Sequence, residues 1–396
     1  MIKFWTYKRE YKKYKKVLLN KIKKSIDSGI IFFGNELKTF EKNFIKQNKA
    51  KYGIAVGSGT DALLICLKSI GIKKGDEVIT AANTAIPTIS AIINAGAIPR
   101  LVDIGEDYLI DVKKIAKEIN KKTKAIIPVH LYGQSCEMTE IVRISKKYNI
   151  KIIEDCAQSQ GAKYKNKFVG NFGEFGCFSF YPTKILGAYG DGGFILTNDY
   201  DLYKKIKRIR FYGIETIDLK NKFLGKYYAN ENGVNSRLDE IQSSILNFKL
   251  KKIDYFIKKR RQLAKLYIQE LKESELKLPY EKDNCEHVYH LFTVYHPKAM
   301  KIITQLKKRE IETRIIYPYP IHKMKAYSHI IKNKQRLANS ESISKGIFSL
   351  PLYPELKIKE IKKICKNLIQ ILKNKDYWKI NFKYFLGLDK YLIGLW

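Results

Sequence analysis

Residues 178–193 read Phe-Ser-Phe-Tyr-Pro-Thr-Lys-Ile-Leu-Gly-Ala-Tyr-Gly-Asp-Gly-Gly, with Lys184 near their centre. The apolar run 175–181 predicts a short buried strand, and residues 193–197 predict another. Pro182 ends the first strand, and the glycines after Lys184 let the backbone approach a ligand closely. A lysine desolvated in such a loop can lose its proton and form a Schiff base with an aldehyde. The alternative is one more solvated lysine in a lysine-rich chain.

Two other stretches favour a functional role for this lysine. Residues 150–155 predict a strand that ends in Asp155, whose carboxylate can pair with a protonated pyridine nitrogen, and Gln158 can hydrogen-bond a ring oxygen. Residues 54–63 predict a strand, a glycine-rich turn and a helix start, which together present backbone N–H groups to a phosphate. A phosphate site, an acid for a pyridinium and a Schiff-base lysine describe a pyridoxal-phosphate pocket.

Six motifs in this order resemble those of the DegT family of nucleotide-sugar aminotransferases, which have the aspartate aminotransferase fold. The resemblance covers residues 29–372. The motifs are Gly57-Ser-Gly-Thr-Asp-Ala-Leu, Glu154-Asp-Cys-Ala-Gln-Ser-Gln-Gly-Ala, Ser179-Phe-Tyr-Pro-Thr-Lys, Gly190-Asp-Gly-Gly, Asn235-Ser-Arg-Leu-Asp-Glu-Ile-Gln and Ser349-Leu-Pro-Leu-Tyr-Pro.

The resemblance implies a role for each motif residue. Lys184 would carry the cofactor and move the proton, and Asp155 would keep the ring nitrogen protonated. The cofactor phosphate would be bound by Gly59, Thr60 and Ser179, and by Asn235 from the neighbouring subunit, which implies a homodimer with shared active sites. Two alternatives stay open, because Ser179 could be a buried core serine and Asn235 could be the N-cap of a helix.

The substrate side of the site is less well defined by the sequence. The candidate substrate-binding residues are His322, Tyr317 and His130. His322 is similar to a family histidine near the sugar, Tyr317 begins the same stretch, and His130 ends a predicted strand. A lone histidine is more often a structural hydrogen-bonding residue. Ala85 stands where many members have an aromatic residue that stacks on the cofactor ring, so stacking here would be aliphatic or come from elsewhere.

The pattern of the whole chain predicts an α/β fold. Short apolar strands alternate with amphipathic helices from residue 53 to residue 154, as in a three-layer α-β-α domain with a mostly parallel sheet. We expect a large cofactor domain at residues 1–250 with an N-terminal helical arm, a smaller α+β domain at 251–375 and an aromatic-rich extension at 376–396. Within them we expect a helix at 8–28, a helix or helix pair at 235–273, and strands at 288–295 and 313–317.

Composition indicates an ordinary soluble globular protein of 396 residues, 45% hydrophobic and 29% charged. The six cysteines have no metal-site spacing, so we expect reduced thiols, no metal and a cytoplasmic location. No apolar run is long enough for a membrane span, and no signal peptide is apparent. The net charge of +36 comes mainly from scattered lysines. It could also attract an anionic substrate or a nucleic acid, although no nucleic-acid-binding motif is apparent.

The predicted activity is transfer of an amino group from glutamate to a nucleotide-linked keto-sugar for amino-sugar or glycan synthesis. The stretch 82–89 resembles members that act on dTDP-3-keto-6-deoxyhexoses, with 4-keto sugars as the alternative. The dehydratase branch of the family has histidine in place of the lysine, so Lys184 argues against it. A different class of function, a regulatory protein that binds nucleic acid on the same fold, would need no intact lysine pocket.

Overall fold

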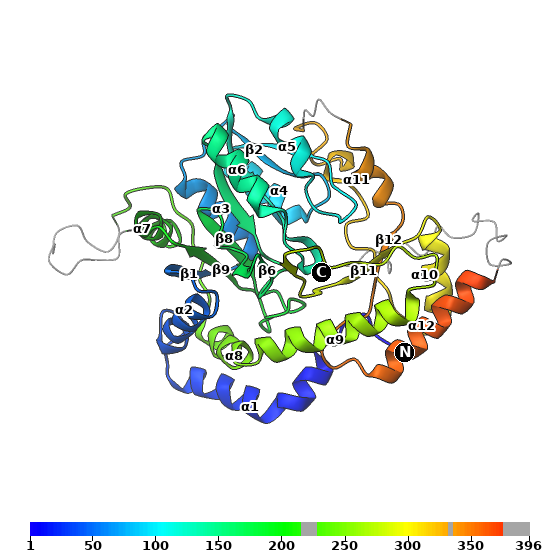
Figure 1. Ribbon diagram of the computed structural model, residues 1–396. Coiled ribbons are helices and arrows are strands. Elements are labelled where there is room, and N and C mark those ends of the chain that lie inside the picture. Colours follow the sequence, from blue (N-terminus) through cyan, green and yellow to red (C-terminus); the bar gives the residue numbers. More distant parts are fainter. Residues whose placement is uncertain (215–227, 332–335, 375–396) are drawn as a thin grey trace.

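The computed structural model describes residues 1–214, 228–331 and 336–374, so the aromatic extension expected at 376–396 lies outside the described residues. A seven-stranded sheet forms its centre, in the order β1-β9-β8-β5-β4-β2-β3 (Figure 1). Only β9 runs antiparallel to its neighbours, which confirms the mostly parallel sheet. The strands are β1 Tyr52–Val56, β2 Glu77–Ala81, β3 Ile98–Val102, β4 Thr123–Ile127, β5 Lys151–Asp155, β8 Phe175–Ser179 and β9 Gly193–Thr197.

Helices cover both faces of this sheet because successive strand residues point to opposite sides. Cys177 of β8 packs in the same core as α3 and α7, whereas the next residue, Phe178, packs in the core with α2 and α8. The three-layer α-β-α arrangement is therefore confirmed. The helices of this part are α1 Lys8–Asp27, α2 Asn35–Gln47, α3 Gly59–Ser69, α4 Ile86–Asn94, α5 Val112–Glu118, α6 Met138–Tyr148, α7 Tyr200–Ile209 and α8 Glu240–Leu250.

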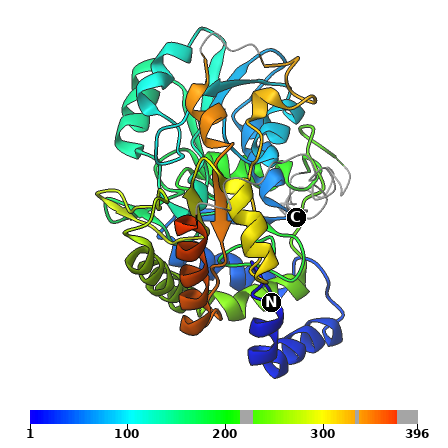
Figure 2. The same ribbon diagram turned by 90° about the vertical axis from the view of Figure 1, so that its right-hand side faces the viewer.

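A second hydrophobic core lies in the C-terminal part of the chain. Helix α9, Ile253–Leu271, continues from α8 and reaches this core, where α10, α12 and a two-stranded sheet pack around its far end (Figures 1 and 2). The division at residue 250 remains a prediction. The remaining elements are β6 Lys163–Tyr164, β7 Lys167–Phe168, β10 Cys285–Glu286, β11 Phe292–Tyr295, α10 Ala299–Lys308, α11 Ala338–Ile343, β12 Ile347–Leu350 and α12 Ile358–Lys373, with 3₁₀ turns at Leu131–Gly133 and Ile321–Lys323.

Three local predictions were wrong. Residues 313–317 form no strand, because only Arg314 makes a single bridge, to Ser349. The strand expected at 288–295 begins only at Phe292, since the preceding residues turn and bond to the backbone of Gly133 and Tyr132. Asn235 is no helix cap, because the helix begins at Glu240 and the Asp239 side chain caps it.

The extreme N-terminus is fixed to the C-terminal core, which the sequence did not indicate. The Ile2 N–H donates to the Glu310 carbonyl at 2.7 Å, and the Glu312 N–H donates to the Ile2 carbonyl at 2.9 Å. The Phe4 N–H then donates to the Glu312 carboxylate at 2.9 Å. These bonds place residues 3–8 along one wall of the cavity described below.

Candidate active site

The site lies where three strands end at the same edge of the sheet. Strands β1, β5 and β8 are mutually parallel, so the loops that follow Val56, Asp155 and Ser179 meet at one edge, as is typical of ligand sites in such sheets. A cavity of about 740 Å³ opens beside these loops. Its volume is in the range of small-molecule sites. Of the predicted site residues it is lined by Lys184, Gln158 and Tyr317.

Lys184 is held in a compact loop between β8 and β9. Its N–H donates to the Tyr181 carbonyl at 2.8 Å, and the Ala188 N–H donates to the Phe180 carbonyl at 2.7 Å. A side chain at Gly187 would lie 2.4 Å from the Pro182 carbonyl, so only glycine fits this turn. Burial lowers the pKa of Lys184 to about 8, against a smaller raising effect of Asp155. About a tenth of the amine is therefore neutral and nucleophilic at pH 7.

Asp155 is a buried carboxylate near this amine. Its Oδ2 accepts a hydrogen bond from the Thr88 hydroxyl at 2.9 Å, and its Oδ1 accepts one from the Ala157 N–H at 3.1 Å. Burial raises the pKa of Asp155, while these two bonds and the charge of Lys184 partly offset that effect. Thr88 was missed by the sequence analysis, because nothing in helix α4 marks one threonine as the partner of a residue 67 positions away.

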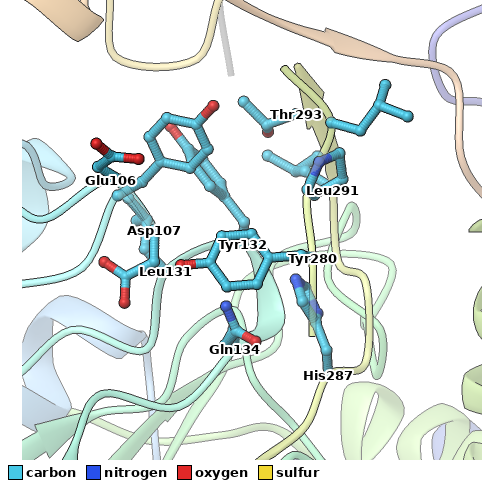
Figure 3. A pocket seen from close by; sticks show the side chains of 12 residues that line it. Glu106, Asp107, Leu131, Tyr132, Gln134, Tyr280, His287, Leu291 and Thr293 are labelled. Atoms are coloured by element: carbon cyan, nitrogen blue, oxygen red, sulfur yellow. The ribbon is translucent and has the colours of Figure 1, made fainter. Parts of the chain in front are cut away.

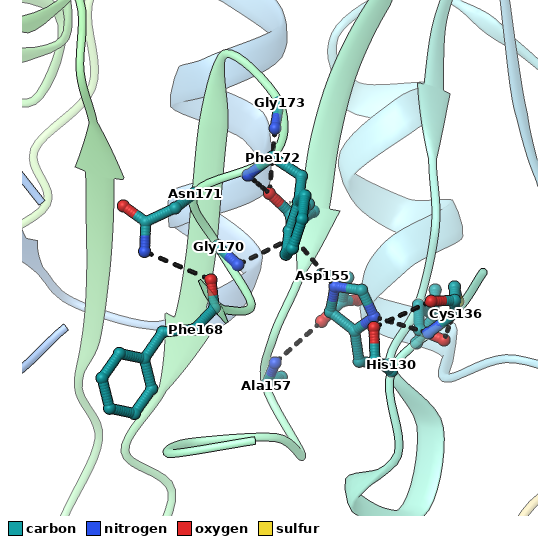
Figure 4. Close-up of polar contacts among 12 residues, drawn as sticks. His130, Cys136, Asp155, Ala157, Phe168, Gly170, Asn171, Phe172 and Gly173 are labelled. Carbon is teal, nitrogen blue, oxygen red and sulfur yellow. Dashed lines mark hydrogen bonds and ion pairs between the residues drawn. The ribbon is translucent and has the colours of Figure 1, made fainter. Parts of the chain in front are cut away.

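The neighbouring Glu154 is structural and points to the opposite side of strand β5, because successive strand residues alternate in direction. Its two oxygens accept N–H bonds from Gly170, Phe172 and Gly173, the loop residues labelled in Figure 4, at 2.6–3.0 Å. His130 Nε2 lies 3.1 Å from the same carboxylate, and His130 Nδ1 accepts the Cys136 N–H at 3.0 Å. Both ring nitrogens of this fully buried histidine are thus engaged, which argues against the expected substrate contact.

The same contacts account for a compact cluster of possible metal ligands, His130, Glu154 and Cys156, whose ligand atoms lie within 4.8 Å of one another. A metal ion there would have to displace the backbone N–H groups that Glu154 already binds. The cluster is therefore better explained as the anchor of the 170–173 loop.

Gln158 is fixed by hydrogen bonds at both ends of its amide. Its Oε1 accepts the Tyr132 N–H at 2.8 Å, and its Nε2 donates to the Tyr317 hydroxyl at 2.7 Å. Tyr132 also stacks on Tyr317, with ring centroids 6.5 Å apart. On its other side Tyr132 lines a second, smaller cavity between residues 106–134 and 278–293 (Figure 3). The orientation of Gln158 in the main cavity is therefore set by the packing of two tyrosines.

The predicted phosphate loop adjoins Ser179. Gly193 of β9 is in register with both Val56 and Ser179, which brings the ends of β1 and β8 together. A side chain at Gly59 would lie 2.8 Å from the Ser179 Cβ. Helix α3 begins at Gly59, so the N–H groups of Gly59 and Thr60 have no partner within the helix.

Ser236 ties the 235–240 segment to this loop. Its Oγ accepts the Gly57 N–H at 2.7 Å and donates to Asp61 Oδ2 at 2.7 Å. Asn235 itself is exposed beside this contact. It is therefore close to the phosphate loop of its own chain and also open to a second subunit.

Two other predicted residues lie outside the lining of the main cavity. His322 is bonded to Glu341 at 2.9 Å, and Ala85 is the residue before helix α4, where the next residue, Ile86, lines the cavity. In contrast, Arg260 and His290 line the cavity without having been predicted there.

The chemistry of these groups fits pyridoxal phosphate. A lysine with a pKa of about 8 suits the aldehyde, and a buried carboxylate suits a protonated ring nitrogen. The N–H groups at the start of α3, which have no partner within the helix and lie next to Ser179, suit the phosphate. In the part of the chain that the structure describes, no helix has the length and apolar character needed to cross a membrane.

Comparison with known proteins agrees with this chemistry. Residues 12–369 match the model of the DegT/DnrJ/EryC1/StrS aminotransferase family. The chain is 41% identical to the dTDP-3-amino-3,6-dideoxy-alpha-D-galactopyranose transaminase of Aneurinibacillus thermoaerophilus, over 92% of this chain and 98% of that one. It is 38% identical to the dTDP-3-amino-3,4,6-trideoxy-alpha-D-glucose transaminase of Micromonospora megalomicea subsp. nigra, over 89% and 94% of the two chains.

Solved structures give the same result. The crystal structure of DesV from S. venezuelae in complex with a ketimine intermediate superposes with a TM-score of 0.89 at 32% identity, covering 94% of this chain and 99% of that one. Enzymes of this family carry pyridoxal phosphate or its amino form. The chain therefore belongs to the DegT/DnrJ/EryC1/StrS aminotransferase family and is a sugar aminotransferase that uses pyridoxal phosphate.

Proposed function

We propose that this enzyme transfers an amino group from glutamate to the C3 keto group of a dTDP-linked 3-keto-6-deoxyhexose. The observation that carries the proposal is that Lys184, which lines a cavity of about 740 Å³, lies near enough to buried Asp155 for the two charges to influence each other. The choice of C3 is supported by the stretch 82–89 and by two relatives named as dTDP-3-amino-sugar transaminases. A 4-keto sugar is the alternative within the family.

Each residue near Lys184 has a distinct part in this reaction. When bound, pyridoxal phosphate supplies a ring that withdraws electrons from the carbon carrying the amino group. Lys184, about half of whose amine is neutral at pH 8, would remove the proton from that carbon and deliver it to the cofactor carbon that carried the aldehyde. Asp155 would accept a hydrogen bond from the protonated ring nitrogen, and Thr88 and Ala157 hold its carboxylate in place. Gln158, held between Tyr132 and Tyr317, orients the ring oxygen.

The phosphate would be bound by the N–H groups of Gly59 and Thr60 and by the Ser179 hydroxyl. These groups are supported in that role by their convergence at the ends of β1 and β8. Fixing the phosphate in this way would keep the ring nitrogen within reach of Asp155 while the amino donor and the keto-sugar exchange.

We also propose a homodimer whose partner subunit completes each site. Four consecutive apolar side chains, residues 30–33, are 37–50% exposed and would be covered in a dimer. The Phe32 ring lies 4.2 Å from the Arg237 guanidinium carbon, which places this apolar segment beside exposed Asn235. A surface that joins an apolar segment to a candidate phosphate ligand is a suitable interface for a shared site.

The test is a matched pair of substrates. Purified enzyme with pyridoxal phosphate and glutamate is supplied with a dTDP-3-keto-6-deoxyhexose or with the 4-keto isomer. Formation of 2-oxoglutarate is measured by a coupled assay, and the aminated sugar by mass spectrometry. We expect turnover with the 3-keto sugar and none with Lys184→Ala. Turnover with the 4-keto sugar alone would refute the assignment of C3.

A further inference from the structure

Arg260 and His290 form a polar group inside the cavity that the steps above do not use. Arg260, on α9, is only 3% exposed, and His290 is 5% exposed, yet both line the cavity that Lys184 also lines. Buried charged and polar side chains require partners, so this pair calls for an explanation.

The hydrogen bonds of Arg260 leave part of its guanidinium unused. Its Nη1 donates to the carbonyls of His290 at 3.0 Å, Leu352 at 2.9 Å and Tyr289 at 3.3 Å. The buried Nε has no partner among the described residues. The negative charges of Glu355 and Glu10 act on this arginine, but among the described residues neither carboxylate accepts a hydrogen bond from its guanidinium. Three carbonyls thus fix the position of a buried cation whose charge is not neutralised by a contacting anion.

His290 is also incompletely bonded. Its buried Nδ1 has no hydrogen-bond partner among the described residues. Burial, together with the positive charges of Lys184 and Arg260, keeps the pKa of His290 well below its ordinary value, so the ring is neutral and can donate one N–H. The charges of both Lys184 and Arg260 lower the pKa of this ring, so the ring lies near both residues.

We propose that Arg260 and His290 bind a carboxylate of the amino donor while its amino group is at Lys184. A carboxylate accepts charge-assisted hydrogen bonds from guanidinium groups and would neutralise the buried charge of Arg260. This inference rests on the proposed function, in which glutamate is the donor, and assigns the residues that hold it.

The depth of the pair favours a small anion. Arg260 and His290 are almost fully buried, whereas Lys3 and Tyr319 of the same cavity are exposed, Tyr319 by 57%. The bulky nucleoside diphosphate of the other substrate fits the exposed part of the cavity better. A carboxylate on a short carbon chain can reach the buried part.

Binding of glutarate, a dicarboxylate with no amino group, tests the pair in the enzyme loaded with pyridoxal phosphate. Its dissociation constant is measured by calorimetry, with dTDP as the second probe. Arg260→Gln should weaken glutarate binding about tenfold or more and change dTDP binding less than about twofold. Arg261→Gln is the matched control, because the adjacent Arg261 bonds to Glu281 and the His287 carbonyl outside this cavity. It should change neither constant.

Arg260→Gln could fail to fold, since Nη1 holds three carbonyls. His290→Gln leaves that anchor intact and should by itself weaken glutarate at least about threefold. Unchanged glutarate affinity in either folded variant, or equal weakening of glutarate and dTDP, would overturn the inference. The reaction of L-alanine with the loaded enzyme shows which carboxylate is bound: a slower reaction in the variants indicates the α-carboxylate, and an unchanged one the side-chain carboxylate. Failure of the proposed function is a separate result, namely wild-type enzyme that aminates no nucleotide keto-sugar.

Discussion

Replacing Asp155 by Asn should lower the pH at which the apoprotein captures pyridoxal phosphate. Only the neutral amine of Lys184 attacks the aldehyde, so the rate of capture reports its protonation. Burial lowers the pKa of this amine to about 8, and Asp155 opposes that effect. At pH 7 about a tenth of the amine is then neutral, against roughly 0.03% for an ordinary lysine, a gain of roughly 300-fold in nucleophile.

Burial of Lys184 and the charge of Asp155 determine how the capture rate depends on pH. In the wild type the capture rate should rise about tenfold per pH unit below pH 8 and level off above it. Asp155→Asn removes a charge that raises the pKa of Lys184, so the midpoint should move below 8. Turnover should nevertheless fall by about a hundredfold or more, because the ring nitrogen loses the charge that keeps it protonated.

The assay is stopped-flow absorbance of apoprotein mixed with pyridoxal phosphate between pH 6 and about 10.5. This range contains the lowered pKa of Lys184 and the pKa of an ordinary lysine. Asp201→Asn is the control, since the Asp201 side chain is 87% exposed on α7, and it should leave the midpoint unchanged. A wild-type midpoint near 10.5 would show that the cavity does not desolvate Lys184. A midpoint that rises in Asp155→Asn would show that the two groups do not interact as the structure indicates.

Three other perturbations test separate parts of the structure. Borohydride should fix the cofactor permanently on Lys184, which peptide mass spectrometry can locate, and Lys184→Ala should fold but retain neither the covalent link nor turnover; a label on another lysine would refute the assignment. A mixture of the Lys184→Ala and Asn235→Ala variants should regain activity if the lysine and the asparagine of one pocket come from different chains. Each heterodimer would then have one intact pocket and up to about half of the wild-type activity. If subunit exchange is confirmed and no activity returns, Asn235 belongs to the pocket of its own chain. Glu154→Gln should lower the free energy of unfolding by about 3 kcal/mol, because a buried carboxylate that binds three backbone N–H groups loses its charge. Glu140→Gln, at a surface ion pair, is the control and should leave the denaturation midpoint nearly unchanged in the same experiment.

The sequence by itself determined the alternating part of the fold. Periodicity predicted short strands alternating with helices from residue 53 to residue 154, and the structure has this alternation, because each element buries one face or both faces in a large core. Local chemistry also predicted Lys184, Asp155, Gln158 and the loop before α3 as site residues, since each lies at a strand end or in the loop that follows one. Parallel strands bring such positions to one edge, so their proximity could be inferred without coordinates.

Contacts between distant segments were decided only by the tertiary structure. Thr88 reaches Asp155, and Arg260 reaches the carbonyls of His290 and Leu352, through packing that leaves no periodic trace in the sequence. The position of the N-terminal residues that line the cavity was likewise not apparent from the sequence. His130 follows a strand, which suggested a substrate contact, but buried neighbours contact both of its ring nitrogens. A strand end fixes the position of a residue in the fold. The groups that hydrogen-bond to its side chain depend on the segments that pack around it.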